Sequence, residues 1–202
     1  MTPSLRRRRL ARAQGELAPP AVLVAGRSPA ADVFAAVDVC YLDSGGARAA
    51  LVAGCDPQFS SVMWSATVIT ATAEEYRPGE FWRRELPPLR AVLDGVAGLA
   101  LIVIDGYVDL DPGGRPGLGA RVHAEFGVPV IGAAKTMFRG AVHASQVRRG
   151  RASRPLYVTA AGLGVPAAAR LVARMAGPYR IPDALRLADR LARGLEQPSC
   201  QG

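Results

Sequence analysis

Apolar and polar positions alternate along the chain in two patterns, which together predict an α/β fold. The clearest pattern is at 99–104, where six consecutive apolar residues, three of them β-branched, predict a strand that is buried on both faces. Other apolar runs predict further strands, at 32–41, 47–53, 61–72, 128–131 and 155–159.

The first three of these strands are separated by short turn sequences. Asp-Ser-Gly-Gly at 43–46 is typical of a hairpin turn, and Asp56 and Pro57 mark the next turn. Strands joined by short turns pair antiparallel, because parallel neighbours need a crossover of about a dozen residues or more. We therefore expect a three-strand antiparallel meander in the first part of the sheet.

Apolar residues recur at helical spacing between and after the later strands. The longest such segment is 80–97, in which Pro87 and Pro88 should break the first turns and make the helix irregular near Glu85. The segment 132–135 is expected to be a turn off the end of the preceding strand. Further helices are predicted at 4–17, 120–126, 166–175 and 182–193, the first of them basic.

The order of these elements predicts one domain over 1–202, without an internal repeat or a linker. The meander supplies an antiparallel half of a mixed β-sheet, and the later strands, which alternate with helices, supply a parallel half. Helices should flank this sheet. Open α/β sheets bind their ligands at the carboxyl ends of the strands, so residues at those ends are the first candidates for a site.

Composition adds one feature to this picture, the charge. The 202 residues carry a net charge of +8 at pH 7, which favours a polyanionic partner such as nucleic acid, although arginines on solvated faces would give the same balance. No apolar run could span a bilayer and no secretory signal is expected, so we predict no membrane association. Three widely spaced cysteines indicate a reducing cytoplasm and argue against a zinc site.

Lys135 is the only lysine of the chain. Apart from the histidines, its other basic residues are all arginines. A compact ammonium cannot be replaced by a planar guanidinium at a tight phosphate or water site. Its being the single lysine makes Lys135 a candidate for such a site.

Two carboxylates interrupt the most apolar strands. Asp105 ends the run at 99–104 and is followed by Gly106, which allows a turn or the close approach of a ligand. Asp38 lies within the strand at 32–41. Burying a charged carboxylate in such a place costs free energy unless a cationic side chain or a metal ion binds it. If the two strands are neighbours, the two carboxylates face each other.

Two carboxyl groups that lie so close together do not both ionise unless a cation is present. Mg²⁺ or Mn²⁺, which prefer oxygen ligands, would satisfy this pair, and Glu85 and Asp189 could complete the set of ligands. Such a cluster suits metal-assisted hydrolysis of a phosphodiester. The alternative is structural: Asp38 caps a turn and Asp105 pairs with an arginine.

Seven segments of the chain carry a resemblance to a known family. They are Ala36-Val-Asp-Val39, Tyr76-Arg-Pro-Gly79, Arg84-Glu-Leu-Pro87, Val103-Ile-Asp-Gly106, 128–135, Pro155-Leu-Tyr-Val158 and Leu187-Ala-Asp189. Their order and spacing resemble those of the endonuclease V family over essentially the whole chain, to about Arg193. The resemblance implies an RNase H-like fold and Mg²⁺-dependent cleavage of DNA or RNA on the 3′ side of a deaminated purine such as inosine, one phosphodiester beyond it.

The resemblance also implies roles for individual residues. Lys135 would lie beside the attacked phosphate, where it positions water or stabilises developing charge. The metal-binding carboxylates would be Asp38, Glu85, Asp105 and Asp189. The first three of these carboxylates, together with Lys135, form the expected catalytic set.

The substrate-binding residues follow from the same resemblance. A loop would supply the wedge that fills the gap left by a flipped base, and backbone groups of two glycine turns would line the base pocket. The loop after Asp105, which differs in this chain from the family pattern, would contribute two more contacts to the substrate. The expected substrate-binding residues are Tyr76, Pro78 and Gly79 for the wedge, Gly106 and Gly132 for the pocket, and Tyr107 and Asp111 in the altered loop.

The chain departs from the family at that loop, where Asp111 stands in place of a histidine in a His-Pro-Arg motif, and at 162–164, which lacks a Gly-His-Arg motif. A carboxylate near a polyanion lowers affinity. These departures motivate an alternative: the fold is repurposed as a biosynthetic enzyme or partner subunit that acts on a small-molecule phosphate or sulfate ester. A third possibility is a catalytically inactive module that binds structured RNA or lesion DNA.

Overall fold

The computed structural model describes residues 32–43, 45–71 and 80–195. The predicted basic helix at 4–17 and the predicted wedge residues Tyr76, Pro78 and Gly79 lie outside the described residues. None of the helices that the structure describes has the length and apolar character needed to cross a bilayer.

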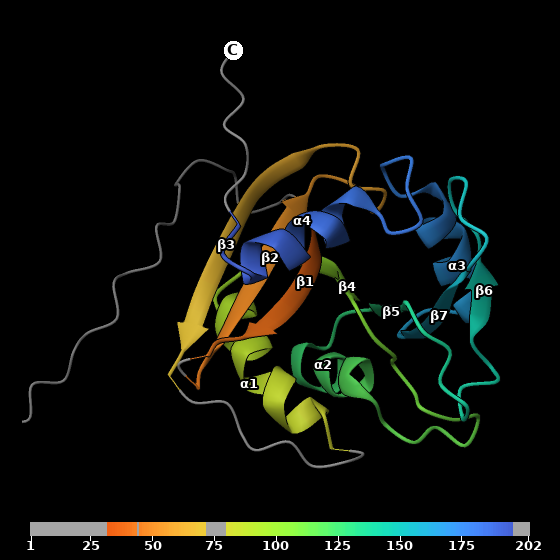
Figure 1. Cartoon of the computed structure of the whole chain (residues 1–202), viewed down its shortest axis with the longest axis horizontal. Helices are drawn as coiled ribbons and strands as arrows, with labels where there is room; N and C mark the ends of the chain where they lie inside the picture. The colour runs from red at the N-terminus through yellow and green to blue at the C-terminus, as the bar shows by residue number, and fades with distance from the viewer. Residues whose placement is uncertain (1–31, 44, 72–79, 196–202) are drawn as a thin grey trace, which may run out of the picture.

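A seven-stranded mixed sheet forms the centre of the molecule (Figure 1). Its strand order is β3-β2-β1-β4-β5-β7-β6, in which β1, β4 and β5 run parallel and the other neighbours are antiparallel. The predicted meander is confirmed as β1, β2 and β3. The strands are β1 (Val33–Tyr41), β2 (Ala47–Gly54), β3 (Val62–Thr70), β4 (Leu99–Ile104), β5 (Val130–Ala134), β6 (Ser145–Val147) and β7 (Leu156–Ala161).

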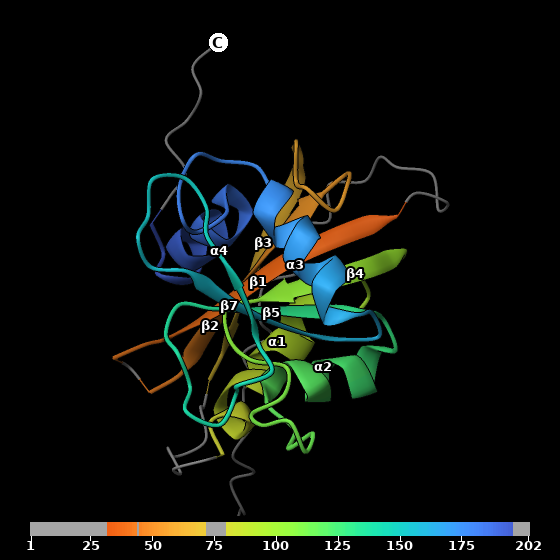
Figure 2. The same ribbon diagram turned by 90° about the vertical axis from the view of Figure 1, so that its right-hand side faces the viewer.

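Two pairs of helices cover the two faces of this sheet, as the turned view shows (Figure 2). α1 and α2 pack on one face, and α3 and α4 pack on the other. Each pair encloses its own apolar cluster, so the sheet is buried between two layers. The helices are α1 (Trp82–Leu93), α2 (Leu118–Phe126), α3 (Val165–Arg174) and α4 (Asp183–Ala192).

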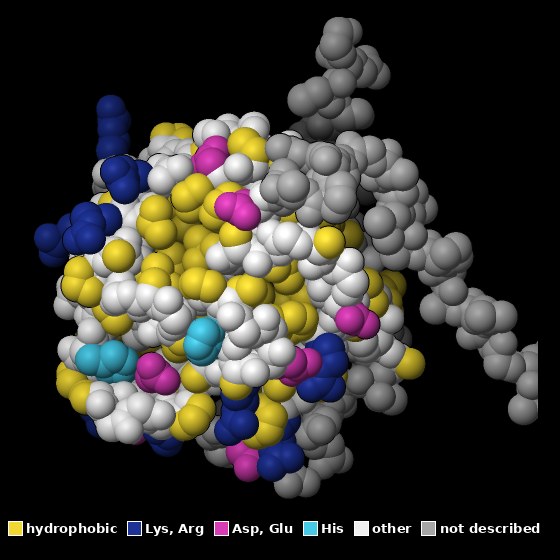
Figure 3. Space-filling model, turned by 180° about the vertical axis from the view of Figure 1, so that it is seen from behind, with side chains coloured by type: hydrophobic (Ala, Val, Ile, Leu, Met, Phe, Trp, Pro, Cys, Tyr) yellow, Lys and Arg dark blue, Asp and Glu magenta, His cyan; other side chains and the backbone are white. Residues whose placement is uncertain are grey.

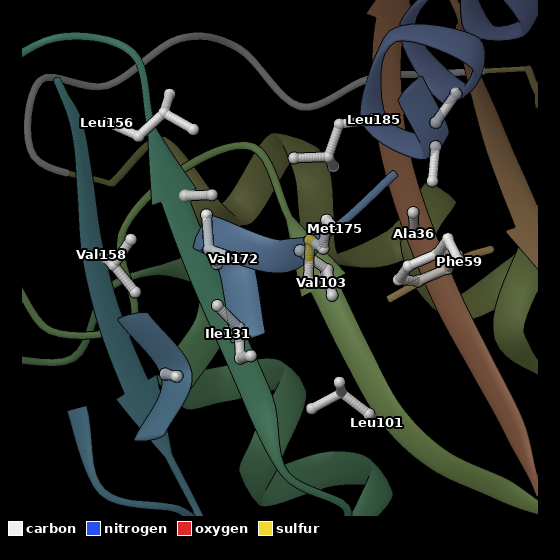
Figure 4. Packing of buried hydrophobic residues seen from close by; sticks show 14 of the residues in the cluster. Ala36, Phe59, Leu101, Val103, Ile131, Leu156, Val158, Val172, Met175 and Leu185 are labelled. Atoms are coloured by element: carbon white, nitrogen blue, oxygen red, sulfur yellow. The ribbon is translucent and has the colours of Figure 1, made fainter. Parts of the chain in front are cut away.

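The prediction that the strand 99–104 is buried on both faces is confirmed. Side chains alternate along a strand, so Leu101 and Val103 pack in the cluster with α3 and α4, whereas Ile102 and Ile104 pack against α1 and α2. Figure 4 shows Leu101 and Val103 beside Ile131 of β5, within the first of these clusters. This central strand carries Asp105 directly after its last residue.

Local structure differs from the expectations in four respects. The helix α1 runs without a break through Pro87 and Pro88, because its buried face, including Pro88 and Leu89, is held against the sheet and packing outweighs the two missing amide donors. It is also shorter than the expected 80–97. The residues 132–134 continue β5 instead of forming a turn, because they pair with β7. Finally, the short strand β6 was not predicted.

The surface shows how the positive charge is distributed on one side of the molecule. Seen from behind, that face exposes a broad apolar area, and Lys and Arg side chains gather at its margins with carboxylates among them (Figure 3). On this face, the described residues form no continuous basic surface.

Candidate active site

The register of β1 and β4 brings Asp38 next to Asp105. Val37 pairs with Ile104, and each of the two acids is the next residue in its chain. β4 ends at Ile104 while β1 continues to Tyr41, so Asp38 lies where the neighbouring strand has just ended. Burial, and then the negative charge of Asp105, raise the pKa of Asp38 to about 7.

Strand alternation directs this part of the site toward α4. Asp38, Asp105 and Lys135 each lie two residues after an apolar residue of the cluster that α3 and α4 cover; these residues are Ala36, Val103 and Ala133. Residues two apart on a strand share one face of the sheet. The three charged groups therefore continue that face beyond the carboxyl ends of the parallel strands, which is where an open α/β sheet binds its ligands.

Lys135 follows the last residue of β5, and its ammonium forms an ion pair with Asp105. Burial alone would lower the pKa of Lys135, but the pairing with Asp105, together with the charges of Asp38 and Asp189, raises that pKa overall. The side chain of Lys135 is 39% exposed, so its ammonium remains accessible to a ligand. The structural alternative, in which Asp105 pairs with an arginine, is therefore wrong: the partner is the only lysine.

Glu85 enters the site from the other side of the sheet, on the first turns of α1. It is 8% exposed, and the Tyr41 hydroxyl donates a hydrogen bond of 3.4 Å to its Oε1 atom. Burial, and then the charge of Asp38, raise the pKa of Glu85 to about 8, although the hydrogen bond from Tyr41 opposes this shift. The nearby cations, Lys135 for Asp38 and Arg84 for Glu85, thus do not offset the effect of burial and of the neighbouring acids.

Asp189 lies on α4, within electrostatic reach of Asp38 and Lys135. Its carboxylate accepts a hydrogen bond of 3.0 Å from Nε of Arg193, one helical turn later. Arg193 therefore satisfies one side of Asp189 at the outer rim of the cluster. The structure brings all four predicted carboxylates to one end of the sheet.

A divalent cation fits the chemistry of these side chains. The potential donors are all carboxylate oxygens, and burial together with neighbouring acids raises the pKa values of Asp38 and Glu85, which a bound cation would lower. Among the described residues, however, no group of three or more acidic, histidine or cysteine side chains is closed around one point. Binding would therefore need side-chain rotations that turn these carboxylates inward.

A cavity of about 230 Å³ opens beside the carboxylates, between α1 and the loop that follows β4. Gly106 and Tyr107 line it, as the sequence predicts, together with Glu85 and Asp105. Its remaining lining residues are mostly apolar or aromatic: Phe81, Trp82, Leu110, Gly117 and Leu118. The cavity therefore offers an apolar chamber with acids at one end.

Two other predicted substrate contacts do not line this cavity. Asp111 accepts a hydrogen bond of 3.1 Å from the Arg115 backbone amide and pairs with the Arg115 guanidinium at 3.3 Å, so its charge is compensated within the loop. Gly132 is buried inside β5, beneath the backbone of Gly106 and Val108.

Gly132 matters because the loop after β4 crosses directly over it. A Cβ atom at this position would lie 2.5 Å from the Gly106 carbonyl oxygen and 2.9 Å from Oγ1 of Thr159. Thr159 Oγ1 itself accepts a 2.8 Å hydrogen bond from the Val108 amide, which ties the loop to β7. A glycine here is what allows the backbone next to Asp105 to approach the sheet so closely.

Gly132→Ala is accordingly expected to destabilise the protein by about 1–3 kcal/mol, because the added methyl group overpacks a buried backbone contact. It should also lower any activity of the site, since the displaced segment carries Asp105. Urea unfolding measures the first effect. Gly164→Ala, whose new Cβ would meet nothing nearer than 3.9 Å, is the matched control. Equal stability of the two variants would contradict the close crossing.

Sequence reasoning missed two residues that support the site. Tyr41 donates to Glu85, and Thr159 holds the loop that follows Asp105. A tyrosine or a threonine in a strand is common, so nothing in the local pattern distinguishes these two positions. Only the pairing of distant strands gives them their partners.

Comparison with known proteins gives a consistent result. A family model described as Endonuclease V matches residues 20–165. The endonuclease V of Azotobacter vinelandii is 32% identical over 188 residues, covering 81% of this chain and 83% of that protein. The crystal structure of endonuclease V from Streptomyces avermitilis is similar with a TM-score of 0.67 and 27% identity, covering 84% of this chain and 83% of that one.

A further solved structure is similar in fold. It is Ciona intestinalis endonuclease V in complex with a 24mer DNA that contains an inosine followed by a ribo-adenosine, with a TM-score of 0.70, 17% identity, and coverage of 82% and 86% of the two chains. At that identity the similarity concerns the fold alone. Together with the seven-stranded mixed sheet, these similarities confirm the predicted α/β, RNase H-like fold.

Proposed function

The chain belongs to the endonuclease V family, and on that basis we propose that it is a metal-dependent endonuclease that cuts nucleic acid on the 3′ side of inosine. The observation that carries the proposal is the register of β1 and β4, which places Asp38 beside Asp105 with Lys135 paired to the latter. The proposed cofactor is Mg²⁺, or Mn²⁺, both of which suit an all-oxygen set of ligands.

In this proposal, Asp38, Glu85, Asp105 and Asp189 hold the cation. The bound cation would supply Lewis-acid stabilisation of the phosphodiester and lower the pKa of a bound water. Lys135, whose ammonium is kept charged by Asp105 and remains accessible, would lie against a phosphate oxygen and stabilise the charge that develops there. Release of Lys135 from Asp105 would free that carboxylate for the metal.

The cavity beside the carboxylates is the proposed site for the flipped base. It lies next to Asp105 and Glu85, so a base held there would bring the strand on its 3′ side close to the metal-binding acids. Trp82 and Tyr107 offer aromatic surface, and Gly106 offers backbone groups, for contact with a purine. Tyr76, Pro78 and Gly79 are proposed as the wedge that replaces the flipped base in the stack.

The comparisons do not favour the alternative of a small-molecule ester substrate. That alternative was motivated by Asp111, whose charge would repel a polyanion, but Arg115 compensates the charge within the same loop. The register of Asp38 with Asp105 and the pairing of Lys135 with Asp105 support the enzyme over an inactive binding module.

The direct test is cleavage of end-labelled oligonucleotides that contain a single inosine, as single strands and duplexes of DNA and of RNA. We expect a nick at the second phosphodiester 3′ of inosine with Mg²⁺ or Mn²⁺, and no nick with EDTA. The same oligonucleotides with adenosine in place of inosine are the control. Intact substrate in all four forms and with both metals would refute the proposed function.

A further inference from the structure

The turn between α3 and α4 is held by a buried arginine from another part of the chain. Arg149 follows β6 and is 6% exposed. Its guanidinium donates hydrogen bonds to successive backbone carbonyls of the turn, including that of Tyr179 at 2.8 Å. The full set of acceptors is Met175, Ala176, Gly177, Tyr179 and Arg180. The turn is therefore held by a side chain that follows β6.

A second arginine, Arg180, extends from this turn to the end of β5. One terminal nitrogen of its guanidinium donates to the carbonyl oxygen of Lys135 and, at 2.7 Å, to that of Pro155. The ladder between β5 and β7 ends with the pair Ala134 and Tyr157, so these two carbonyls lie just beyond it. Arg180 thus connects the end of β5, at Lys135, with the start of the segment that forms β7.

Lys135 lies where its segment leaves the sheet, so its position depends on contacts outside the strand ladder. The described contacts there are that of Arg180 with the Lys135 carbonyl and that of the Tyr107 hydroxyl, which donates a 2.8 Å hydrogen bond to the Thr136 carbonyl. Lys135 is the first residue after β5, its side chain is 39% exposed, and its ammonium must reach Asp105 across the sheet end. A long lysine side chain loses considerable rotamer freedom when it is held in one geometry. A backbone that could shift would spread the ammonium over many positions relative to the carboxylates.

We infer that Arg180 is a positioning residue for Lys135, held in its own place by the turn that Arg149 clamps. The inference rests on the proposed function, in which the Lys135 ammonium lies at the attacked phosphate. Arg180 itself contacts only backbone carbonyls there, so its effect on the reaction is exerted through the placement of Lys135. A guanidinium suits this task because it carries several donors in one rigid plane and can bridge two carbonyls.

The variants that test the inference are Arg180→Gln, Arg180→Lys and, as matched control, Arg186→Gln. Arg186 is on the same segment, but it pairs with Asp183 at the surface and lies over the Tyr179 ring. For Arg180→Gln we expect kcat on an inosine oligonucleotide to fall by about 10- to 100-fold, since a displacement of an ångström at a reacting group has an effect of this size. The KM and the affinity for the oligonucleotide should stay within about twofold, and Arg180→Lys should recover part of kcat.

The single lysine provides a second readout that does not depend on cleavage. Protein labelled with ¹³Cε-lysine gives one lysine signal in a ¹³C–¹H spectrum, and that signal belongs to Lys135. In Arg180→Gln the signal should move toward the position and the narrow line of a mobile, exposed lysine, whereas in Arg186→Gln it should match the wild-type signal. Arg180→Lys contains a second lysine, so it serves only the kinetic test. Arg180→Met, which adds no lysine, is the second variant for this spectrum and decides the matter if Arg180→Gln does not fold.

An unchanged lysine signal in Arg180→Gln and Arg180→Met, or an unchanged kcat with a displaced signal, would overturn the inference. Equal loss of kcat in Arg186→Gln would also overturn it, because the effect would then be general to the segment. If the wild-type protein cleaves none of the oligonucleotides, the proposed function fails, whereas the lysine spectrum still shows whether Arg180 places Lys135.

Discussion

Asp38→Asn is expected to lower the rate of metal-dependent cleavage by at least about 100-fold. The substitution keeps the size of the side chain but removes the negative charge from the centre of the proposed ligand set. Metal assistance contributes several kcal/mol to such reactions, and each 1.36 kcal/mol corresponds to about tenfold in rate. Single-turnover cleavage of an inosine oligonucleotide with Mg²⁺ measures this loss without interference from product release.

The same variant should be at least as stable as the wild-type protein when no metal is present. Burial raises the pKa of Asp38 to about 7, above its ordinary value of 3.8. A folded-state pKa above the unfolded one means that stability is full at low pH and is lost as the pH rises from about 4 through about 7. The amide never ionises, so Asp38→Asn escapes this loss, and in EDTA its melting temperature should equal or exceed that of the wild type at pH 8.

Addition of Mg²⁺ should reverse this order. A cation that binds only the folded state stabilises it, so the wild-type melting temperature should rise with metal concentration while that of Asp38→Asn stays nearly constant. Asp43→Asn, in the exposed turn after β1, is the matched control and should behave as the wild type in both assays. A variant that is inactive and also strongly destabilised in EDTA would indicate a structural role for Asp38 instead of a metal-binding one.

Arg149→Met is expected to lower the free energy of unfolding by about 2–4 kcal/mol, because a buried acceptor left unsatisfied costs about 1–3 kcal/mol and several carbonyls lose their donor at once. The methionine keeps part of the apolar stem but donates no hydrogen bond, so the buried carbonyl of Met175 and the partly buried carbonyls of Gly177 and Tyr179 lose this partner. Urea unfolding of the full chain measures the change. The effect should exceed that of most single substitutions because several acceptors are orphaned at once.

Arg151→Met is the control for this prediction, because Arg151 lies two residues later and is exposed. We expect its stability to be within about 0.5 kcal/mol of the wild type, as is usual for surface positions. Since Arg149 also holds the turn from which Arg180 reaches Lys135, the Arg149 variant should be less active under conditions in which it is still folded. Equal stability of the two variants would mean that the turn does not depend on the carbonyl contacts.

Two errors of the sequence interpretation show where tertiary contacts outweigh a local sequence pattern. Two consecutive prolines normally end a helix, but α1 continues through Pro87 and Pro88 because its apolar face is buried on the sheet. Glycine followed by two alanines suggested a turn at 132–134, whereas pairing with β7 makes this segment a strand. In both cases an interaction with a distant element outweighed the local preference.

By itself, the sequence determined the meander, the strand at 99–104 that is buried on both faces, and the two acids Asp38 and Asp105 that lie within or directly after these strands. Apolar runs and turn residues act locally, and a charged residue that interrupts an apolar strand is visible without any coordinates. Only the tertiary structure decided that Asp38 and Asp105 lie in register, that Lys135 and not an arginine is the partner of Asp105, and that Arg180 supports it. Such contacts join residues from separate strands and turns, and their geometry depends on strand order and register, which no local pattern encodes.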